Sequence, residues 1–219
     1  IEADLPGTEK YLDELLLWRE LAYNFCANTP RERLETLGAI PEWARRTLAA
    51  HADDPRDAIY DWDTLARAAT GDRVWDAAQR SLTLNGELHN NLRMTWGKAL
   101  PKWTRTADDA LRLLIDLNHR FALDGNNPSS YGGLLWCLGQ FDRAFPPARP
   151  VLGEIRDRTT TLANQRFNVD LYEKNVAREH GYAPLKVAVI GAGVSGLACA
   201  RTLADQGGWR NADMPNWFA

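Results

Sequence analysis

The strongest constraint on the fold is the spacing of apolar residues, which recur every three or four positions from Thr8 to about Ala177 between Pro, Gly and Asn turns. This is the period of a helix that buries one face, and hardly any segment alternates as a half-buried strand does. One helix is expected from Thr8 to about Cys26, and Thr106 with Asp109 forms a capping box before the apolar run Leu111 to Leu123. The sequence therefore predicts a mainly α fold.

The pattern changes near the C-terminus. Residues 185–190 are typical of a buried strand, and a Gly-x-Gly-x-x-Gly turn and a helix to about Gln206 follow. We therefore expect a helical domain at residues 1–176, a linker at 177–184 and an incomplete Rossmann-like βα fragment at 185–219. The three glycines are Gly191, Gly193 and Gly196; they predict a pyrophosphate site for a second FAD or NAD(P), and the alternative is an ordinary tight turn.

Composition excludes some classes of protein and leaves others open. The chain of 219 residues is 45% hydrophobic and 25% charged, as soluble globular proteins are. Its three cysteines are far apart and have no clustered histidines, which argues against a disulfide framework or a metal site. Neither a signal peptide nor an apolar run of about 18 residues is present, so we expect a cytoplasmic protein without a membrane span. The formal charge of −3 decides nothing about nucleic acids.

Tryptophan is unusually abundant, with nine in the chain. Trp75, Trp96 and Trp103 fall within 29 positions, and Trp96 and Trp103 share one side if their helix continues past Pro101 with a kink. Three indoles at such spacing are usually aromatic core. Because indole is also one of the most easily oxidised side chains, a bound redox cofactor would favour an electron-carrying role instead.

Two polar residues occupy positions where a helix should be apolar. Glu14 lies four residues before Trp18, on one face of the first expected helix. It is either a rim residue that reaches solvent or pairs with Arg19, or a carboxyl group in an apolar pocket that hydrogen-bonds a ligand. Asn118 interrupts an apolar stripe, and a buried amide without partners costs ~1–3 kcal/mol. Its partner is either another side chain or the polar edge of a ring-shaped ligand.

Several sequence blocks, taken together and in order, resemble the flavin-binding helical domain of class II cyclobutane pyrimidine dimer photolyases. The resemblance spans roughly Leu12 to Gly153. The blocks are residues 12–21 (LDELLLWREL), 75–79 (WDAAQ), 92–98 (LRMTWGK), 117–125 (LNHRFALDG) and 133–137 (GLLWC). The implied fold is a partial photolyase/cryptochrome FAD-binding helical domain, and the family's N-terminal α/β domain is expected to be missing.

The resemblance implies roles for residues that would face damaged DNA. Glu14 corresponds to the glutamate that hydrogen-bonds the pyrimidine dimer, and Met94 to the methionine that touches the thymine rings. Trp18 and Trp136 correspond to indoles that line the lesion pocket, with Arg19 as a further DNA contact. The implied partner is UV-damaged DNA, bound by a protein expected to be a monomer.

The resemblance also implies roles beside the flavin. Trp75, Trp96 and Trp103 correspond to the tryptophan chain that re-reduces FAD after light absorption. Asn118 corresponds to the asparagine beside flavin N5, which gains a proton on reduction, and Arg93 with Asp124 to an ion pair that flanks the ring system. The loop 124–131 departs from the family, because it has Asn and Ser where Arg, Asp, Asn and Gly are frequent.

The implied activity is light-driven repair, in which reduced FAD donates an electron to a cyclobutane pyrimidine dimer. The protein would be a DNA-binding flavoprotein and a carbon-carbon lyase, with its antenna chromophore left open. On its own the chain is expected to hold FAD weakly or not at all. Two alternatives stand beside this one: an FAD- or NAD(P)-dependent oxidoreductase fusion or blue-light photoreceptor with a photolyase-like part, and a helical interaction module whose indoles are only core. The C-terminal motif resembles amine-oxidase or renalase-type flavoproteins and favours the oxidoreductase alternative.

Overall fold

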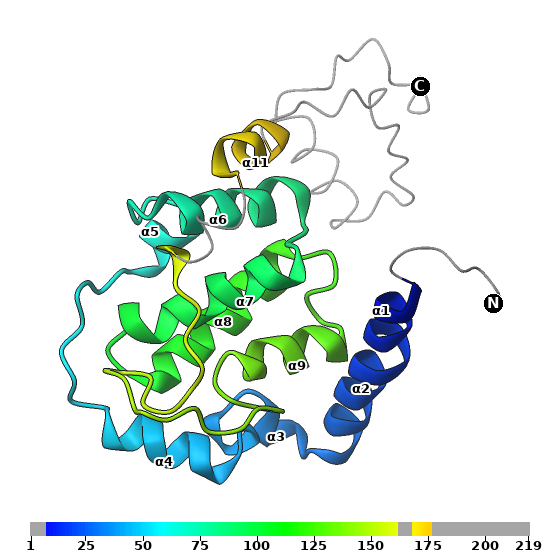
Figure 1. The fold of residues 1–219 in the computed structure, drawn as a ribbon, viewed down its shortest axis with the longest axis vertical. Helices are drawn as coiled ribbons and strands as arrows, with labels where there is room; N and C mark the ends of the chain where they lie inside the picture. Colours follow the sequence, from blue (N-terminus) through cyan, green and yellow to red (C-terminus); the bar gives the residue numbers. More distant parts are fainter. Residues whose placement is uncertain (1–7, 162–167, 177–219) are drawn as a thin grey trace, which may run out of the picture. The chain divides into compact units, whose positions relative to one another are not determined.

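The structure is a computed structural model that describes residues 8–161 and 168–176. The chain divides into two compact units, Ile1–Arg178 and Glu179–Ala219, and every described residue belongs to the first. This part consists of helices and loops, with one isolated antiparallel bridge between Arg149 and Gly153 (Figure 1). The expected mainly α fold is confirmed for these residues. The predicted linker 177–184 and βα fragment 185–219 lie outside them.

Most of the helices are short and are separated by tight turns. In chain order they are α1 Thr8–Leu12, η1 Asp13–Trp18, α2 Arg19–Asn28, α3 Arg31–Leu34, η2 Leu37–Ala39, α4 Glu42–Ala50, α5 Trp62–Ala66, α6 Arg73–Asn85, α7 Asn90–Ala99, η3 Leu100–Trp103, α8 Ala107–Phe121, α9 Pro128–Trp136 and α11 Val169–Val176. The predicted cap of α8 is confirmed, because the Thr106 hydroxyl oxygen accepts a hydrogen bond from the Asp109 N–H at 3.0 Å. After α9 the described chain runs through turns and loops as far as residue 159.

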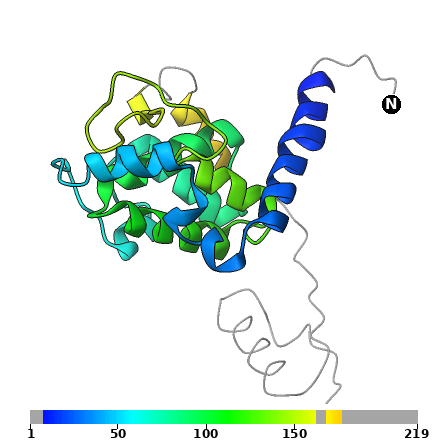
Figure 2. The ribbon, with the colours of Figure 1, turned by 90° about the horizontal axis from the view of Figure 1, so that it is seen from below.

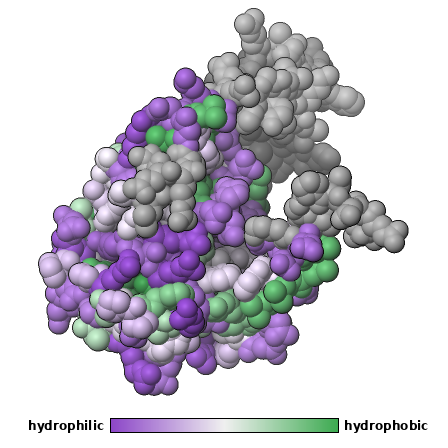
Figure 3. Space-filling model, in the orientation of Figure 1, coloured by the Kyte–Doolittle hydropathy of each residue, from purple (hydrophilic) through white to green (hydrophobic). Residues whose placement is uncertain are grey.

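The first helix is continuous from α1 through η1 to α2, but η1 has π-helical geometry. Figure 2 shows this helix beside the main body of the bundle. Its α2 part packs against α9, where a Cβ on Gly132 would lie 2.9 Å from the Cβ of Ala22. The contact therefore needs a glycine. Hydrophobic side chains remain exposed along the outer face of this helix, among them Leu16 and Leu17 (Figure 3).

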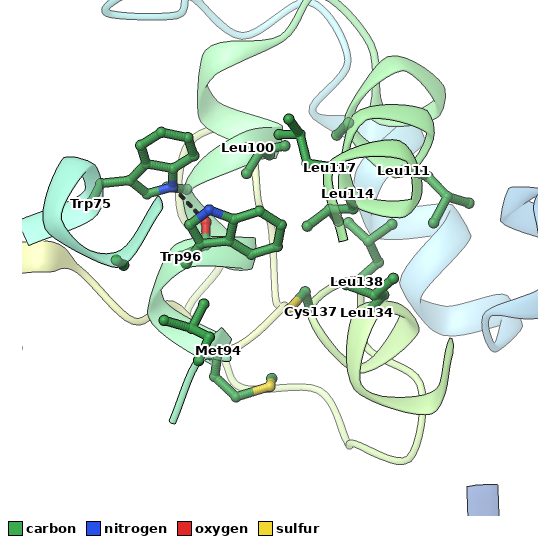
Figure 4. Packing of buried hydrophobic residues seen from close by; sticks show 14 of the residues in the cluster. Trp75, Met94, Trp96, Leu100, Leu111, Leu114, Leu117, Leu134, Cys137 and Leu138 are labelled. Atoms are coloured by element: carbon green, nitrogen blue, oxygen red, sulfur yellow. Dashed lines mark hydrogen bonds between the residues drawn. The ribbon is translucent and has the colours of Figure 1, made fainter. Parts of the chain in front are cut away.

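The core lies among α6, α7, α8 and α9 (Figure 4). Trp75 and Trp96 are its largest side chains and are completely buried, together with leucines from α8 and α9. Gly97 allows α7 to approach α9 closely, because a Cβ at this position would lie 2.4 Å from the Cys137 Sγ. This dense packing holds the end of α9 against the middle of α7. In the part of the chain that is described, no helix has the length and apolarity that a membrane span requires.

Candidate functional site

A pocket of about 320 Å³ opens between the first helix, α7 and α9. Six of the residues predicted as site residues line it. They are Glu14, Trp18, Arg19, Arg93, Asp124 and Trp136. The remaining lining residues are Ala22, Leu88, Asn90, Ser129, Gly132, Gly133 and Phe141. Two carboxyl groups, two guanidinium groups and aromatic rings thus line one cavity.

The π-helical turn η1 places Glu14 and Trp18 at this pocket. A π turn shifts the angular position of every residue that follows it, and such turns are frequent at functional sites. Trp18 packs against Trp136 from α9 in a tilted arrangement, with ring centroids 4.9 Å apart and ring planes at 42°. Trp136 also meets Phe141 edge to face at 6.0 Å. The two indoles that the sequence predicted for one pocket therefore contact each other, and Trp18 is still 36% exposed.

Arg93 forms the polar wall of the pocket. Its Nη2 donates to the Asp124 Oδ1 at 3.2 Å and its Nη1 to the Asp124 Oδ2 at 3.3 Å, so the predicted ion pair is present and bidentate. Bidentate pairs fix the plane of a guanidinium group. The same Nη1 donates to the Ser130 Oγ at 3.1 Å. Ser130 is fully buried.

Behind Arg93, Ser130 accepts a second hydrogen bond. The Asn118 Nδ2 donates to the Ser130 Oγ at 3.1 Å and to the Gly125 carbonyl oxygen at 3.4 Å. Asn118 is 1% exposed, as its place in an apolar stripe predicted, and its Oδ1 has no hydrogen-bond partner. The alternative of a side-chain partner is thus realised for the NH2 group, and the ligand alternative for the oxygen stays a prediction.

The three predicted tryptophans form one contiguous series. Trp75 stacks on Trp96 with centroids 6.1 Å apart and planes at 10°, and it meets Trp103 edge to face at 5.4 Å. The 3-10 turn η3 continues α7 past Pro101 and brings Trp103 to Trp75. The Trp75 Nε1 donates to the Trp96 carbonyl oxygen at 2.9 Å. Trp75 is therefore the central ring, and the sequence did not reveal this order.

Two predicted site residues are placed differently from the rest. Met94 is 8% exposed, belongs to the core and does not line the pocket that contains Glu14 (Figure 4). Arg19 lines the pocket but pairs with Glu20, at 2.7 Å, so the suggested pairing of Arg19 with Glu14 is not the one formed. Gly191, Gly193 and Gly196 lie outside the described residues.

Sequence reasoning missed two buried polar side chains beside the site. Ser130 looked like a loop residue, yet α9 begins at Pro128 and encloses it in the first helical turn. Gln79 is fully buried in α6, where its Oε1 accepts the Trp96 indole N–H at 2.9 Å. An isolated serine or glutamine carries no signal of this kind in a single sequence. The only hint for Ser130 was the departure of its loop from the family pattern.

Ionisable groups near the end of α9 are shifted by burial. Desolvation lowers the pKa of Lys98, whose Nζ donates at 3.4 Å to the carbonyl oxygens of Trp136 and Cys137. Desolvation also raises the pKa of the Cys137 thiol to about 11, so that this sulfur is a protonated packing group. The Lys98 Nζ thus lies against the C-terminus of α9, where carbonyl groups lack helical partners.

Comparisons with known proteins show what this chain is similar to. No protein-family model matches the chain. It is similar to the deoxyribodipyrimidine photo-lyase of Arabidopsis thaliana, with 37% identity over 167 residues, 76% of this chain and 33% of the relative. The photo-lyase of Methanothermobacter thermautotrophicus is 35% identical over 163 residues, 74% of this chain and 36% of the relative. The photo-lyase of Oryza sativa subsp. japonica is 38% identical over 176 residues, which are 80% of this chain and 34% of the relative.

These similarities support a photolyase-family domain in this chain, and the helical fold agrees with the helical domain of that family. The chain spans about a third of the length of the relatives that it matches.

Proposed function

We propose that this chain is the flavin- and lesion-binding part of a class II cyclobutane pyrimidine dimer photolyase. The observation that carries the proposal is the pocket itself, which gathers Glu14, Trp18, Arg93 and Trp136 from three separate helical segments. Relatives named deoxyribodipyrimidine photo-lyase at 35–38% identity support the same conclusion.

The polar groups beside the pocket suit a reduced flavin ring. The buried Oδ1 of Asn118 has no partner and is a pure acceptor, which fits a ring N–H. The bidentate pair of Arg93 and Asp124 offers a fixed positive and negative group beside it. FAD, when bound, would supply the light-driven electron. In this assignment Asn118, Arg93 and Asp124 hold and orient it.

The lesion would be held by the other side of the pocket. A pyrimidine dimer flipped out of a duplex presents two stacked faces and amide-like edges. Trp18 and Trp136 offer indole faces for stacking, since both line the pocket and lie in contact. Glu14 offers a carboxyl group for hydrogen bonding to a base edge, and Arg19 lies at the rim to contact phosphate. Met94 is proposed to reach the thymine rings only if its side chain leaves the core.

The stacked tryptophans are proposed to carry an electron to the flavin. Trp96, Trp75 and Trp103 make a chain of ring contacts from the buried core to a partly buried end. Oxidation would pass outward along these rings while the electron passes inward. The surrounding core excludes water from the first two, which are completely buried. The protein then supplies the path and the dry environment, and the redox chemistry belongs to the cofactor.

Lesion-selective binding tests the proposal without light or cofactor. A duplex with one thymine dimer and the matching undamaged duplex would be titrated into the chain and followed by tryptophan fluorescence. The proposal predicts tighter binding of the damaged duplex, and weaker selectivity in Glu14→Gln by about tenfold, the effect of one hydrogen bond to a charged group. The control is Glu42→Gln in α4, an exposed glutamate that does not line the pocket. Equal binding of both duplexes by the wild-type chain would contradict the lesion pocket.

The second FAD or NAD(P) site proposed at Gly191, Gly193 and Gly196 rests on the sequence alone. Equilibrium dialysis tests this site by measuring how many molecules of flavin or nicotinamide nucleotide bind per chain. The proposal predicts two. One class of site lost in Gly193→Val would support it. Unchanged binding in that variant would contradict it.

A further inference from the structure

The buried hydroxyl of Ser130 receives two donors and connects two parts of the site. The Arg93 Nη1 and the Asn118 Nδ2 each donate to its oxygen at 3.1 Å. Arg93 lines the pocket, whereas Asn118 is not among the lining residues. Ser130 is therefore the one hydrogen-bonded bridge that the described residues show between the guanidinium group and the amide.

The Ser130 hydroxyl and the Gly125 carbonyl together set which way the Asn118 amide points. Its NH2 group has two acceptors, the Ser130 Oγ and the Gly125 carbonyl. If the amide turned over, its oxygen would face the Gly125 carbonyl, and two acceptors would repel each other. The Gly125 contact is long, at 3.4 Å, so Ser130 provides the shorter of the two hydrogen bonds. Asn118 Oδ1 is thereby held as the end without a partner.

Gly125 has to be a glycine for this arrangement. A Cβ there would lie 2.8 Å from the His119 Cα and 3.0 Å from the Asn118 carbonyl oxygen. The loop can thus fold back on the end of α8 and bring its carbonyl to the Asn118 amide. The loop 124–131 therefore supplies both acceptors of the Asn118 NH2 group, the Gly125 carbonyl oxygen and the Ser130 hydroxyl oxygen.

We propose that Ser130 is a positioning residue that turns the Asn118 amide oxygen toward a hydrogen-bond donor on the bound cofactor. This inference rests on the proposed function for the identity of that donor, a ring N–H of reduced FAD. Without the hydroxyl, the guanidinium group of Arg93 attracts the amide oxygen instead of the amide nitrogen. Asn118 then turns over and presents NH2 where the site needs an acceptor.

The first test uses the chain without flavin. NMR of the side-chain NH2 protons of Asn118, assigned with Asn118→Leu, reports their exchange with water. In the wild-type chain both protons should be protected. In Ser130→Ala one should exchange about tenfold faster, as expected for loss of one buried hydrogen bond. Ser81→Ala is the matched control, because this buried hydroxyl in α6 donates to the Glu87 carbonyl and α6 contributes no residue to the pocket.

The second test measures affinities for oxidised and reduced FAD in a chimera that carries residues 12–153 of this chain in place of the matching segment of the Arabidopsis relative, because the chain alone is expected to hold FAD weakly or not at all. Ser130→Ala should weaken binding of reduced relative to oxidised FAD by about tenfold, for the same lost hydrogen bond. In an Asn118→Leu background, Ser130→Ala should have no further effect on the ratio of the two affinities. A general loss of packing would instead change this ratio equally in both backgrounds.

The outcomes separate the two proposals. Protection unchanged in Ser130→Ala, or an affinity ratio that shifts equally in the Asn118→Leu background, would overturn the role of Ser130. If the chimera binds no FAD in any variant while the amide protons of the chain lose protection as predicted, the flavin assignment fails and the positioning of Asn118 by Ser130 stands.

Discussion

Replacing Trp75 by phenylalanine should affect both stability and electron transfer, because this ring is central to the tryptophan series. Its indole is completely buried, stacks on Trp96 and donates a hydrogen bond at 2.9 Å to the Trp96 carbonyl. Losing that bond removes about 1 kcal/mol. The smaller ring leaves unfilled space equivalent to about two methylene groups, or about 1.6 kcal/mol. The expected loss in the free energy of unfolding is therefore about 2–3 kcal/mol.

Urea unfolding followed by circular dichroism would measure this loss. Trp62→Phe is the matched control, since Trp62 is 38% exposed and its indole N–H donates to Asp116 at the surface. That substitution should change the free energy of unfolding by about 0.5 kcal/mol or less. A Trp75→Phe chain as stable as the wild type would refute the packing argument.

The same substitution tests the order of the rings. The described contacts join Trp96 to Trp75 and Trp75 to Trp103. In a chimera that carries residues 12–153 of this chain in place of the matching segment of the Arabidopsis relative, blue-light reduction of bound FAD should become at least tenfold slower in Trp75→Phe. Reduction at the wild-type rate would show that Trp75 is not on the path.

Two further predictions follow from the contact between α7 and α9. Gly97→Ala should destabilise the fold by about 1–3 kcal/mol, because its Cβ would lie 2.4 Å from the Cys137 Sγ, and Cys137→Ala should recover part of this loss in urea unfolding. If the two losses simply add, the clash is not their cause. Burial lowers the pKa of Lys98, so the unfolded chain binds more protons than the folded one just below the ordinary value of 10.5. The contribution of Lys98 to the free energy of unfolding therefore rises with pH in that window, whereas the raised pKa of Cys137 acts in the opposite direction. The free energy of unfolding of the wild type minus that of Lys98→Met should increase with pH there, and parallel pH profiles for the two chains would contradict this.

Residue pattern indicated that the three tryptophans could lie close together and that Asn118 interrupts an apolar stripe, whereas the series as an electron path came from the family resemblance. Trp75, Trp96 and Trp103 are close in sequence and lie on helices joined by short turns, so their meeting depends on local geometry. Asn118 stood out because helix periodicity is regular over α8, and the structure buries it as that period requires. The burial of Asn118 follows from the 3.6-residue repeat.

Other parts of the site depend on tertiary contacts that no local pattern encodes. The π turn in η1 changes the direction in which the side chains of Glu14 and Trp18 point, and no pattern in residues 13–18 predicts such a turn. Ser130 is buried only because α9 packs on the core, and Met94 points into the core although its neighbour Arg93 lines the pocket. Conversely, the family resemblance predicted that Glu14 and Arg93 belong to one site, which composition and spacing could not have shown.

The most direct test of the central claim is loss of thymine dimers from a defined oligonucleotide by the chimera with residues 12–153, under blue light and in the dark, with FAD present. The account predicts repair in the light only, reduced about tenfold or more in Glu14→Gln and unchanged in Glu42→Gln. A chimera that binds FAD and damaged DNA but leaves the dimers intact in blue light would contradict it.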